Sequence, residues 1–215
     1  MTLVHVVYDS EKVGIAQGSN EWHQARLGKA TASRISDIVA TIKTGYAASR
    51  AKYAGQLIAE RLTGVPADTY SNAAMAWGTQ QEPNARLAYG YFHECMVTQV
   101  GFIDHPTIAM SGCSPDGLVG EDGLVEIKCP DTHTHIDTLL GKNVKSEYIT
   151  QMQWQMACTG RSWCDFVSYD PRLPENNQLF TQRITRNDMV IDRLEKEVKL
   201  FLAEIDDTIA KLRKL

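Results

Sequence analysis

Residues 114–128 read SPDGLVGEDGLVEIK, and their pattern predicts the local structure in the middle of the chain. Two short runs rich in valine, leucine and isoleucine, at 116–120 and 124–128, flank the segment GEDG at 120–123. Glycine and aspartate between two apolar runs are typical of a tight turn. The two runs are therefore predicted to be strands of one β-hairpin.

The hairpin is expected to gather three charged side chains. Residues two apart on a strand point to the same face, about 7 Å apart along the chain, so Glu126 and Lys128 should be neighbours. Asp116 begins the other strand and should lie across the hairpin within a residue or two of Glu126. Two carboxylates and an ammonium are costly to bury together unless something organises them.

A hard cation such as Mg²⁺ would organise this group. Mg²⁺ prefers carboxylate oxygens and keeps several of its waters. A metal-bound water loses its proton more readily, and a nearby lysine can position that water or take its proton. The metal also neutralises charge on a phosphate in the transition state. These are the parts that phosphodiester hydrolysis needs. Taken alone, so short a pattern favours a surface salt bridge in which Asp116 is only a turn residue.

Hydrophobic periodicity predicts the elements around the hairpin. Strands are expected at 3–8, 97–104, 108–113, 165–169 and 179–185, and helices at 22–40, 46–63, 73–95, 146–159 and over the last 28 residues. Pro83 means that the third helix either begins there or is kinked there. His133 and His135 are interpreted as loop residues rather than zinc ligands. The pattern predicts a mixed α/β domain with helices around a central sheet.

The last helix has a long apolar stripe that steps by three and four residues. Such a stripe is compatible with packing on its own domain or on a neighbouring subunit. Thr185 followed by Asp188 resembles a capping box at the start of this helix.

Length and composition favour one domain over residues 1–215. No run of eighteen apolar residues is present, so no membrane span is expected. The N-terminus has no basic residue before its apolar run and is not interpreted as a secretory signal. The five cysteines form no CxxC pair and are interpreted as reduced, mostly buried thiols. These features indicate a cytoplasmic protein.

The net charge of −4, from 22 basic and 26 acidic residues, counts against nucleic-acid binding. The segment 22–64 nevertheless contains seven basic and two acidic residues, a local surplus of +5. This surplus could line a channel for DNA or could simply aid solubility, and charge alone does not decide between them.

The spacing PD-x9-E-x-K matches the core of the PD-(D/E)xK nucleases, and the chain resembles the phage lambda-type exonuclease family of viral alkaline exonucleases. Matching blocks occur in the same order over most of the chain. They are WHQARLG at 22–28, TAS at 31–33, AWG at 76–78 followed by Glu82, CSPDGL at 113–118, EIKCP at 126–130, Tyr148 with Gln151 and Gln153, and YDPR at 169–172.

The resemblance implies a restriction-endonuclease-like core with a central mixed sheet flanked by helices. It implies that Asp116 and Glu126 are ligands of the main metal ion, with the carbonyl of Ile127 as a third. Glu82 occupies the place of a helical carboxylate that completes a two-metal site. Pro83 directly follows Glu82 and leaves its exact placement open.

The resemblance also assigns residues that touch the substrate or the attacking water. Lys128 would handle the water, Gln151 would orient water or phosphate, and Gln153 would line the same face. The terminal 5′-phosphate would be held by Arg26, Ser33 and Ser114. A forked guanidinium and two hydroxyl donors suit a phosphate.

The activity implied is metal-dependent 5′-to-3′ degradation of one strand of linear double-stranded DNA. The enzyme would start at 5′-phosphorylated ends, release mononucleotides and leave a 3′ single strand for recombination. The family implies two Mg²⁺ ions per site, with Mn²⁺ as an alternative. It also implies a ring-shaped homotrimer around DNA, a single-strand annealing partner, and the bacterial host cytoplasm for a phage-encoded protein.

Three other functions stay open from the residues. A PD-(D/E)xK endonuclease would cut circular duplex DNA. A non-catalytic DNA-end-binding protein would bind ends without degrading them, although it would have no need of Asp116, Glu126 and Lys128 together. A hydrolase of small phosphoesters would have no need of a pocket for a DNA end.

Overall fold

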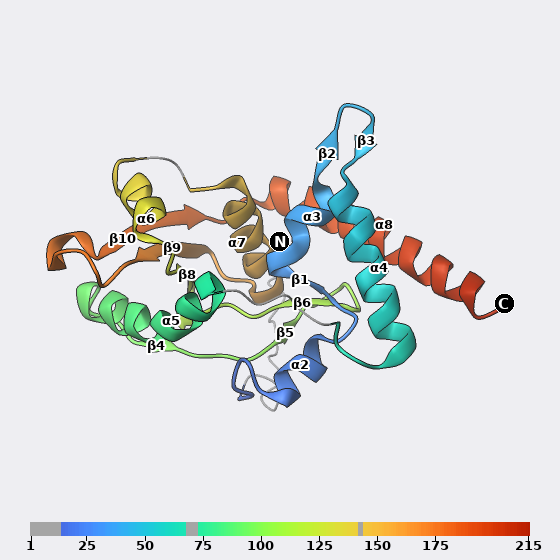
Figure 1. Cartoon of the computed structure of the whole chain (residues 1–215), viewed down its shortest axis with the longest axis horizontal. Helices are drawn as coiled ribbons and strands as arrows, with labels where there is room; N and C mark the ends of the chain where they lie inside the picture. The colour runs from blue at the N-terminus through green and yellow to red at the C-terminus, as the bar shows by residue number, and fades with distance from the viewer. Residues whose placement is uncertain (1–13, 68–72, 142–143) are drawn as a thin grey trace.

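The structure is a computed structural model that describes residues 14–67, 73–141 and 144–215 (Figure 1). The strand expected at 3–8 lies outside the described residues. In chain order the described elements are α2 (Asn20–Arg26), β1 (Ala30–Thr31), η1 (Ala32–Arg34), α3 (Ile35–Val39), β2 (Thr41–Ile42), β3 (Gly45–Tyr46), α4 (Ala48–Thr63), α5 (Ala73–Phe92), β4 (Val97–Thr98), β5 (Ile103–Asp104), β6 (Ser111–Cys113), β7 (Gly117–Val119), β8 (Gly123–Lys128), α6 (Thr132–Leu139), α7 (Ser146–Thr159), β9 (Trp163–Tyr169), η2 (Glu175–Asn177), β10 (Leu179–Thr185) and α8 (Asp188–Leu212).

The main sheet has five strands in the order β10-β9-β8-β7-β4. Strands β8 and β9 are parallel, and the other neighbours are antiparallel, so the sheet is mixed. A smaller sheet has the order β1-β6-β5, and strands β2 and β3 form a hairpin that projects from the body (Figure 1). The expected mixed α/β architecture is therefore confirmed.

The hairpin predicted from the central stretch is formed by β7 and β8. Val119 pairs with Gly123 beside the turn, and Gly117 pairs with Val125 farther along. Gly120 has a φ of +54°, a left-handed conformation that glycine adopts without the steric cost of a side chain. The turn residues thus fix the register, and the register sets which charged residues face one another.

Helices cover both faces of the main sheet, and alternation along β8 decides which side chain meets which helix. Val125 and Ile127 pack with Ala85 and Tyr89 of α5. Leu124, one residue earlier, packs with the methionines of α7 on the opposite face. Strand β8 is buried almost throughout, as expected for a strand covered on both sides. Glu126 shares its face with Leu124 and therefore points toward α7.

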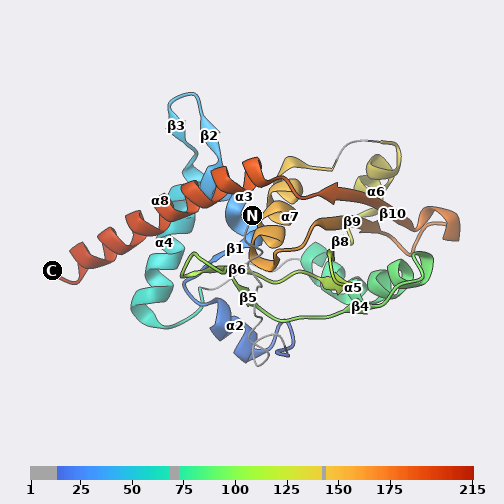
Figure 2. The same ribbon diagram turned by 180° about the vertical axis from the view of Figure 1, so that it is seen from behind.

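Helix α8 packs on the domain that contains it. Its buried residues Leu194, Val198 and Phe201 join one apolar cluster with residues of α3, α4 and α7. The last turns of α8 extend past α4 (Figure 2). The helix is capped by Asn187, whose side chain accepts a hydrogen bond from the backbone N–H of Val190 at 3.2 Å. The predicted cap at Thr185 is therefore wrong, because β10 continues through that residue.

The helix expected at 22–40 is divided into three pieces. Gly28 interrupts it with a φ of +66°, and a Cβ atom there would lie 2.6 Å from Cγ of Arg61. Ala30 and Thr31 then pair in parallel with β6. The strand expected at 97–104 is also divided, because β4 joins the main sheet and β5 joins the small one.

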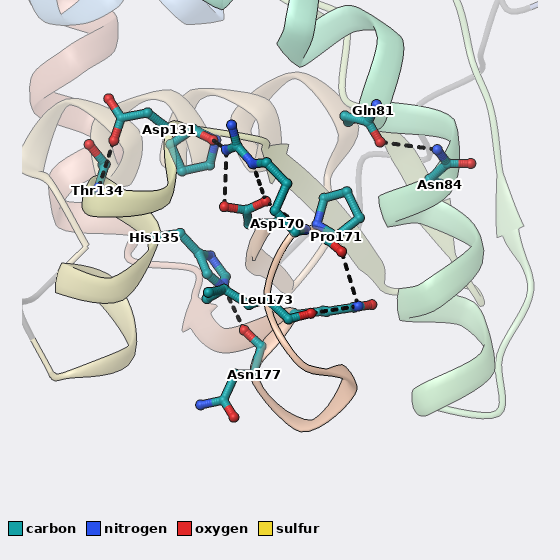
Figure 3. Close-up of polar contacts among 12 residues, drawn as sticks. Gln81, Asn84, Asp131, Thr134, His135, Asp170, Pro171, Leu173 and Asn177 are labelled. Atoms are coloured by element: carbon teal, nitrogen blue, oxygen red, sulfur yellow. Dashed lines mark hydrogen bonds and ion pairs between the residues drawn. The ribbon is translucent and has the colours of Figure 1, made fainter.

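Two other helices differ from expectation. Helix α5 already includes Ala73 and runs past Pro83, so it does not begin at the proline. Helix α6 was not predicted, and the interpretation of His133 and His135 as loop residues is wrong. The side chain of Asp131 caps α6 through the backbone N–H of Thr134 at 2.8 Å (Figure 3). The ring of His135 is buried and lies 2.9 Å from the carbonyl of Asn177 (Figure 3).

The strand expected at 108–113 is shortened to Ser111–Cys113, and the other predicted elements are confirmed with small changes at their ends. Helix α4 ends at Gly64, which has a left-handed φ of +69°, and α7 ends likewise at Gly160. All five cysteines are free thiols, and only Cys95 is more than marginally exposed to solvent. Among the described helices, none combines the length and apolar character that crossing a membrane requires.

Candidate active site

Asp116 and Glu126 meet across the hairpin, as predicted. The pairing of Gly117 with Val125 places the next residue of each strand, Asp116 and Glu126, opposite one another. Oδ2 of Asp116 accepts a hydrogen bond from the backbone N–H of Ile127 at 2.6 Å. The backbone of β8 therefore holds Asp116 beside the strand that carries the other two charges.

The carboxylate of Glu126 is the centre of the group. Its side chain is 1% exposed. Oε1 accepts hydrogen bonds from Nζ of Lys128 at 2.5 Å and from Nε2 of Gln151 at 2.7 Å. Oε2 accepts one from Nε2 of Gln155 at 2.6 Å. The Lys128 ammonium also lies 4.9 Å from the ring centroid of Tyr148 on α7. The strand supplies the charges and α7 supplies the amides that hold them.

Glu82 reaches the same group from α5 on the other side of the sheet. It forms an ion pair with Arg86, one turn later on the helix. Nε of Arg86 donates to the backbone carbonyl of Asp116 at 3.0 Å, which ties the helix to the start of β7. Helix α5 thus places Glu82 beside Asp116 despite Pro83.

The carboxylates perturb one another. Burial raises the pKa of Asp116 well above its usual value, and the charges of Glu126 and Glu82 raise it further. Burial also raises the pKa of Glu82; Arg86 opposes this effect, and Glu126 adds to it. Burial alone would lower the pKa of Lys128, but Glu126 and Asp116 outweigh it and raise that pKa above its usual value. Three carboxylates therefore share a site with insufficient positive charge.

A divalent cation fits the chemistry of this group. Asp116, Glu126 and Glu82 offer the carboxylate oxygens that Mg²⁺ prefers, and added positive charge would relieve their mutual repulsion. Among the residues that the structure describes, no group of three or more acidic, histidine or cysteine side chains is arranged so that it could hold a metal ion as it stands. At present Lys128 forms an ion pair with Glu126, and Arg86 forms one with Glu82. Binding would therefore require these carboxylates to turn partly from their present partners.

Of the three residues expected to hold a terminal phosphate, Ser114 contacts Arg26, and Ser33 lines the same cavity as Arg26. Oγ of Ser114 accepts hydrogen bonds from Nε1 of Trp22 at 2.9 Å and from NH1 of Arg26 at 3.3 Å. The Arg26 guanidinium stacks 4.1 Å from the ring centroid of Trp22. Arg26 and Ser33 line a cavity of about 850 Å³, and Ser33 is exposed. Since Ser114 lies two residues before Asp116, the backbone links this cavity to the carboxylates.

Arg26 differs from most of the basic residues around it. Arg50 pairs with Glu204, and Arg61 pairs with Asp206, both on α8. Lys29 and Arg34 have carboxylate partners too. Within the described ranges no carboxylate forms an ion pair with Arg26. Much of the basic surplus of segment 22–64 is therefore neutralised by acidic residues, while Arg26 lines the cavity without a carboxylate partner among the described residues.

Gln153 does not line this site, and that expectation is wrong. Its buried amide donates to the carbonyl of Thr185 at 2.8 Å and accepts from the backbone N–H of Asn187 at 2.9 Å. Residues two apart on a helix point about 200° away from one another, so Gln151 and Gln153 cannot share a face. Gln155, one turn after Gln151, takes the place beside Glu126 instead.

Gln155 and Arg86 are therefore the site residues that the sequence analysis missed. Each lies four residues after a residue that it did identify, Gln151 and Glu82 respectively. Side chains four apart on a helix are neighbours, so this spacing was the available signal. The role expected for the carbonyl of Ile127 stays a prediction, although its backbone N–H does contact Asp116.

The YDPR block at 169–172 lies at the carboxyl end of β9 and is not part of the carboxylate group of Asp116, Glu126 and Glu82. Asp170 is fully buried and accepts two hydrogen bonds from the Arg172 guanidinium, at 2.7 and 3.0 Å (Figure 3). Burial opposes ionisation, but these bonds hold the pKa of Asp170 below its usual value. The Arg172 guanidinium lies 4.4 Å from the ring centroid of Trp77 on α5. The block thereby fastens α5 to the sheet near Glu82.

Solved structures share this arrangement of elements. An alkaline exonuclease (LHK-Exo) from Laribacter hongkongensis is 55% identical, with 91% of this chain and 97% of that chain covered and a TM-score of 0.85. A structure of LHK-Exo in complex with dAMP gives the same identity and coverage with a TM-score of 0.86. A phage related exonuclease from Haemophilus somnus 129PT is 17% identical over 88% of this chain and 99% of that one, with a TM-score of 0.72, and supports the fold alone.

No curated protein sequence gives a significant match. Alkaline exonucleases have the restriction-endonuclease-like fold, so the expected fold class is confirmed. The family model described as the YqaJ-like viral recombinase domain matches residues 21–162, which include the carboxylate group and the residues Arg26, Ser33 and Ser114. The chain therefore belongs to the YqaJ-like viral recombinase domain family, as its resemblance to the lambda-type exonucleases implied.

Proposed function

We propose that the chain is a 5′-to-3′ exodeoxyribonuclease that degrades one strand of linear double-stranded DNA from 5′-phosphorylated ends. It releases mononucleotides and leaves a 3′ single strand for recombination. The observation that carries the proposal is the short connection between two features. Asp116 belongs to the buried carboxylate group. Ser114, two residues earlier, accepts a hydrogen bond from Arg26, to which we assign binding of the phosphate.

The family and the solved alkaline exonuclease structures support the reaction class. The relative that is 55% identical is an alkaline exonuclease, and its complex with dAMP contains a deoxynucleoside monophosphate, the kind of product that this reaction releases. A site that holds a terminal phosphate favours an enzyme acting from an end. An endonuclease must accept a chain that continues in both directions.

The residues divide the work of hydrolysis. Asp116, Glu126 and Glu82 would hold the metal, which when bound supplies positive charge for the phosphate and lowers the pKa of a bound water. Lys128 lies beside Glu126 and would position the attacking water or take its proton. Gln151 donates to Glu126 and lies where it can also contact that water or the phosphate.

The cavity at Arg26 would hold the new terminal phosphate after each step. The Arg26 guanidinium lies 4.1 Å from the ring centroid of Trp22, and this contact would orient it before the DNA binds. The hydroxyls of Ser33 and Ser114 would donate further hydrogen bonds to the terminal phosphate. The cavity would seat the phosphate at a chain end, and cleavage would then occur at the bond that reaches the carboxylates.

Several finer features belong to this proposal. The carboxylate-rich site suits two Mg²⁺ ions, with Mn²⁺ as an alternative. A single domain over residues 1–215 would assemble as a ring-shaped homotrimer around DNA and hand the 3′ strand to a single-strand annealing protein. We place this activity in the cytoplasm of a bacterial host.

The proposal is tested with duplex DNA and the Lys128→Ala variant. Wild type should release nucleotides from linear DNA with 5′-phosphates when Mg²⁺ is present, and a chelator or the substitution should abolish the release. Linear DNA with 5′-hydroxyl ends should be a poor substrate, and closed circles should stay intact. Cutting of circles would identify an endonuclease instead. Binding of ends by wild type without digestion would identify an end-binding protein.

A further inference from the structure

We propose that Gln155 is a positioning residue that holds the Glu126 carboxylate in the orientation that accepts a divalent cation. The proposal rests on the function proposed above, and it concerns a residue that does not itself contact the substrate or the metal. It arises from the two ends of one carboxylate, which are held by different partners.

Two glutamines on one face of α7 donate hydrogen bonds to the two carboxylate oxygens of Glu126. Gln151 donates to Oε1 at 2.7 Å, and Gln155 donates to Oε2 at 2.6 Å. They are four residues apart, so their side chains lie one above the other on the helix. Gln151 is partly exposed, whereas Gln155 is fully buried. The deeper glutamine therefore cannot reach solvent or DNA, and its amide is available only to the site.

The orientation of the Gln155 amide is fixed from its other end. The thiol of Cys164 on β9 lies 3.8 Å from Oε1 of Gln155, where it can donate a weak hydrogen bond to the amide oxygen. With the oxygen held by the thiol, the NH₂ group faces Glu126. The sheet and the helix together thus present a neutral donor to the carboxylate.

Loss of this donor would affect Glu126 unevenly. Oε1 would keep Lys128 and Gln151. In the described part of the chain Gln155 alone donates to Oε2, so this oxygen would be left buried without a hydrogen bond. A carboxylate in this state gains by turning both oxygens toward the nearest cation, which is Lys128. The ammonium would then compete with a metal ion for the same oxygens, and cation binding should weaken.

The test compares two substitutions on α7. Gln155→Met keeps the length of the side chain and removes the donor. Gln153→Met is the matched control, because Gln153 is an equally buried glutamine on the same helix whose amide bonds to Thr185 and Asn187 instead of Glu126. Binding of Mn²⁺ and Mg²⁺ is measured by titration calorimetry without DNA, and the thermal midpoint of each metal-free protein is measured in parallel.

We expect Gln155→Met to raise the Kd for the metal about tenfold or more, the effect of losing one hydrogen bond to a charged group. Gln153→Met should lower the thermal midpoint and leave the Kd within about twofold of wild type. The kcat of Gln155→Met should recover toward wild type at high metal concentration. A variant Kd equal to wild type would overturn the proposal, and so would equal weakening in both variants.

A second variant keeps the test decisive if Gln155→Met does not fold. Gln155→Asn retains the amide and withdraws it by one methylene, so it should weaken metal binding in the same direction, and an unchanged Kd would overturn the proposal. Failure of the proposed function is distinguishable. A wild-type protein that binds metal but does not digest DNA would refute the nuclease and leave the role of Gln155 to the calorimetry.

Discussion

Replacing Asp116 by asparagine should stabilise the metal-free protein while abolishing its activity. Asp116 and Glu126 lie opposite one another, and both burial and the neighbouring charges raise the pKa of Asp116. Asparagine removes one negative charge and keeps an oxygen that can accept the hydrogen bond from the backbone of Ile127. The native carboxylate is thus retained for metal binding at a cost in stability, as is common in functional sites.

The size of the effect follows from the register. Directly opposed residues place their Cβ atoms about 5 Å apart. Two unit charges at that distance repel by roughly 3 kcal/mol at an effective dielectric constant of about 20. Loss of the attraction between Asp116 and Lys128 offsets part of this gain. We therefore expect a net stabilisation of about 1–2 kcal/mol, or a rise in thermal midpoint of ~2–8 °C for a chain of this size.

The gain should depend on pH in a defined direction. The folded-state pKa of Asp116 is raised above its unfolded value of roughly 3.9, so the folded wild type binds the proton more tightly than the unfolded chain does. Wild type therefore gains stability as the pH falls from neutral through the raised pKa. Asparagine does not titrate, so the advantage of Asp116→Asn should shrink over the same range.

The assay is urea unfolding in a chelator between pH 5 and pH 8, repeated with excess Mg²⁺ at neutral pH. Asp122→Asn is the matched control, because Asp122 is exposed on the turn of the same hairpin. Metal at a hundred times its Kd should stabilise wild type by about 2.7 kcal/mol and Asp116→Asn much less, which reverses their order. A variant that is less stable than wild type in chelator at neutral pH would refute the reasoning.

Three further substitutions test separate parts of the structure. Arg26→Ala should reduce the preference for 5′-phosphorylated over 5′-hydroxyl ends about tenfold or more in kcat/KM. Arg34 lines the same cavity but pairs with Asp37, so Arg34→Ala should leave this preference unchanged. An unchanged preference in Arg26→Ala would contradict the phosphate assignment. Burial, with Lys199 and Arg186, lowers the pKa of His105 to about 4. Wild type should therefore lose at most ~3 kcal/mol of stability as the pH falls from about 6.5 to 4, because the unfolded chain binds the proton first. His105→Gln should remove that loss in unfolding curves, and a pH dependence identical to that of wild type would contradict this prediction. Phe201→Ala should cost about 3–5 kcal/mol in urea unfolding, because Phe201 is fully buried and stacks on Tyr53 at 5.6 Å; a cost below about 1 kcal/mol would mean that α8 does not pack as described.

The hairpin and its charges could be predicted because both depend on neighbours in the sequence. A turn fixes the register of the two strands it joins, and the register places Asp116 opposite Glu126. Helices α4 and α7 were predictable for a similar reason, since each ends at a glycine in the left-handed conformation.

The sequence pattern predicts the wrong local structure where distant parts of the chain determine it. The segment 22–40 has a helical pattern, but Ala30 and Thr31 pair with β6, some eighty residues later in the chain. Helix α6 is short, and His135 at its core is held by Ser168 and Asn177, which lie well beyond it in the sequence. Periodicity within a window cannot contain such partners.

The site shows the same division. Asp116, Glu126, Lys128 and Gln151 were found from motifs, and the structure brings them together. The matching block points to Gln153, whereas helical geometry points to Gln155, one turn after Gln151. The pairing of Ser114 with Trp22 and Arg26 spans about ninety residues and depends on the fold of the small sheet.

The central claim is that cleavage proceeds from a 5′-phosphorylated end, and the order of product release tests it most directly. A linear duplex is labelled at the 5′-phosphates in one sample and at the 3′ ends in another, and both are digested with Mg²⁺ over a short time course. We predict that the 5′ label appears first, as a mononucleotide, while the 3′ label stays on long single strands. Early loss of the 3′ label, or release of the 5′ label on oligonucleotides of mixed length, would contradict the claim.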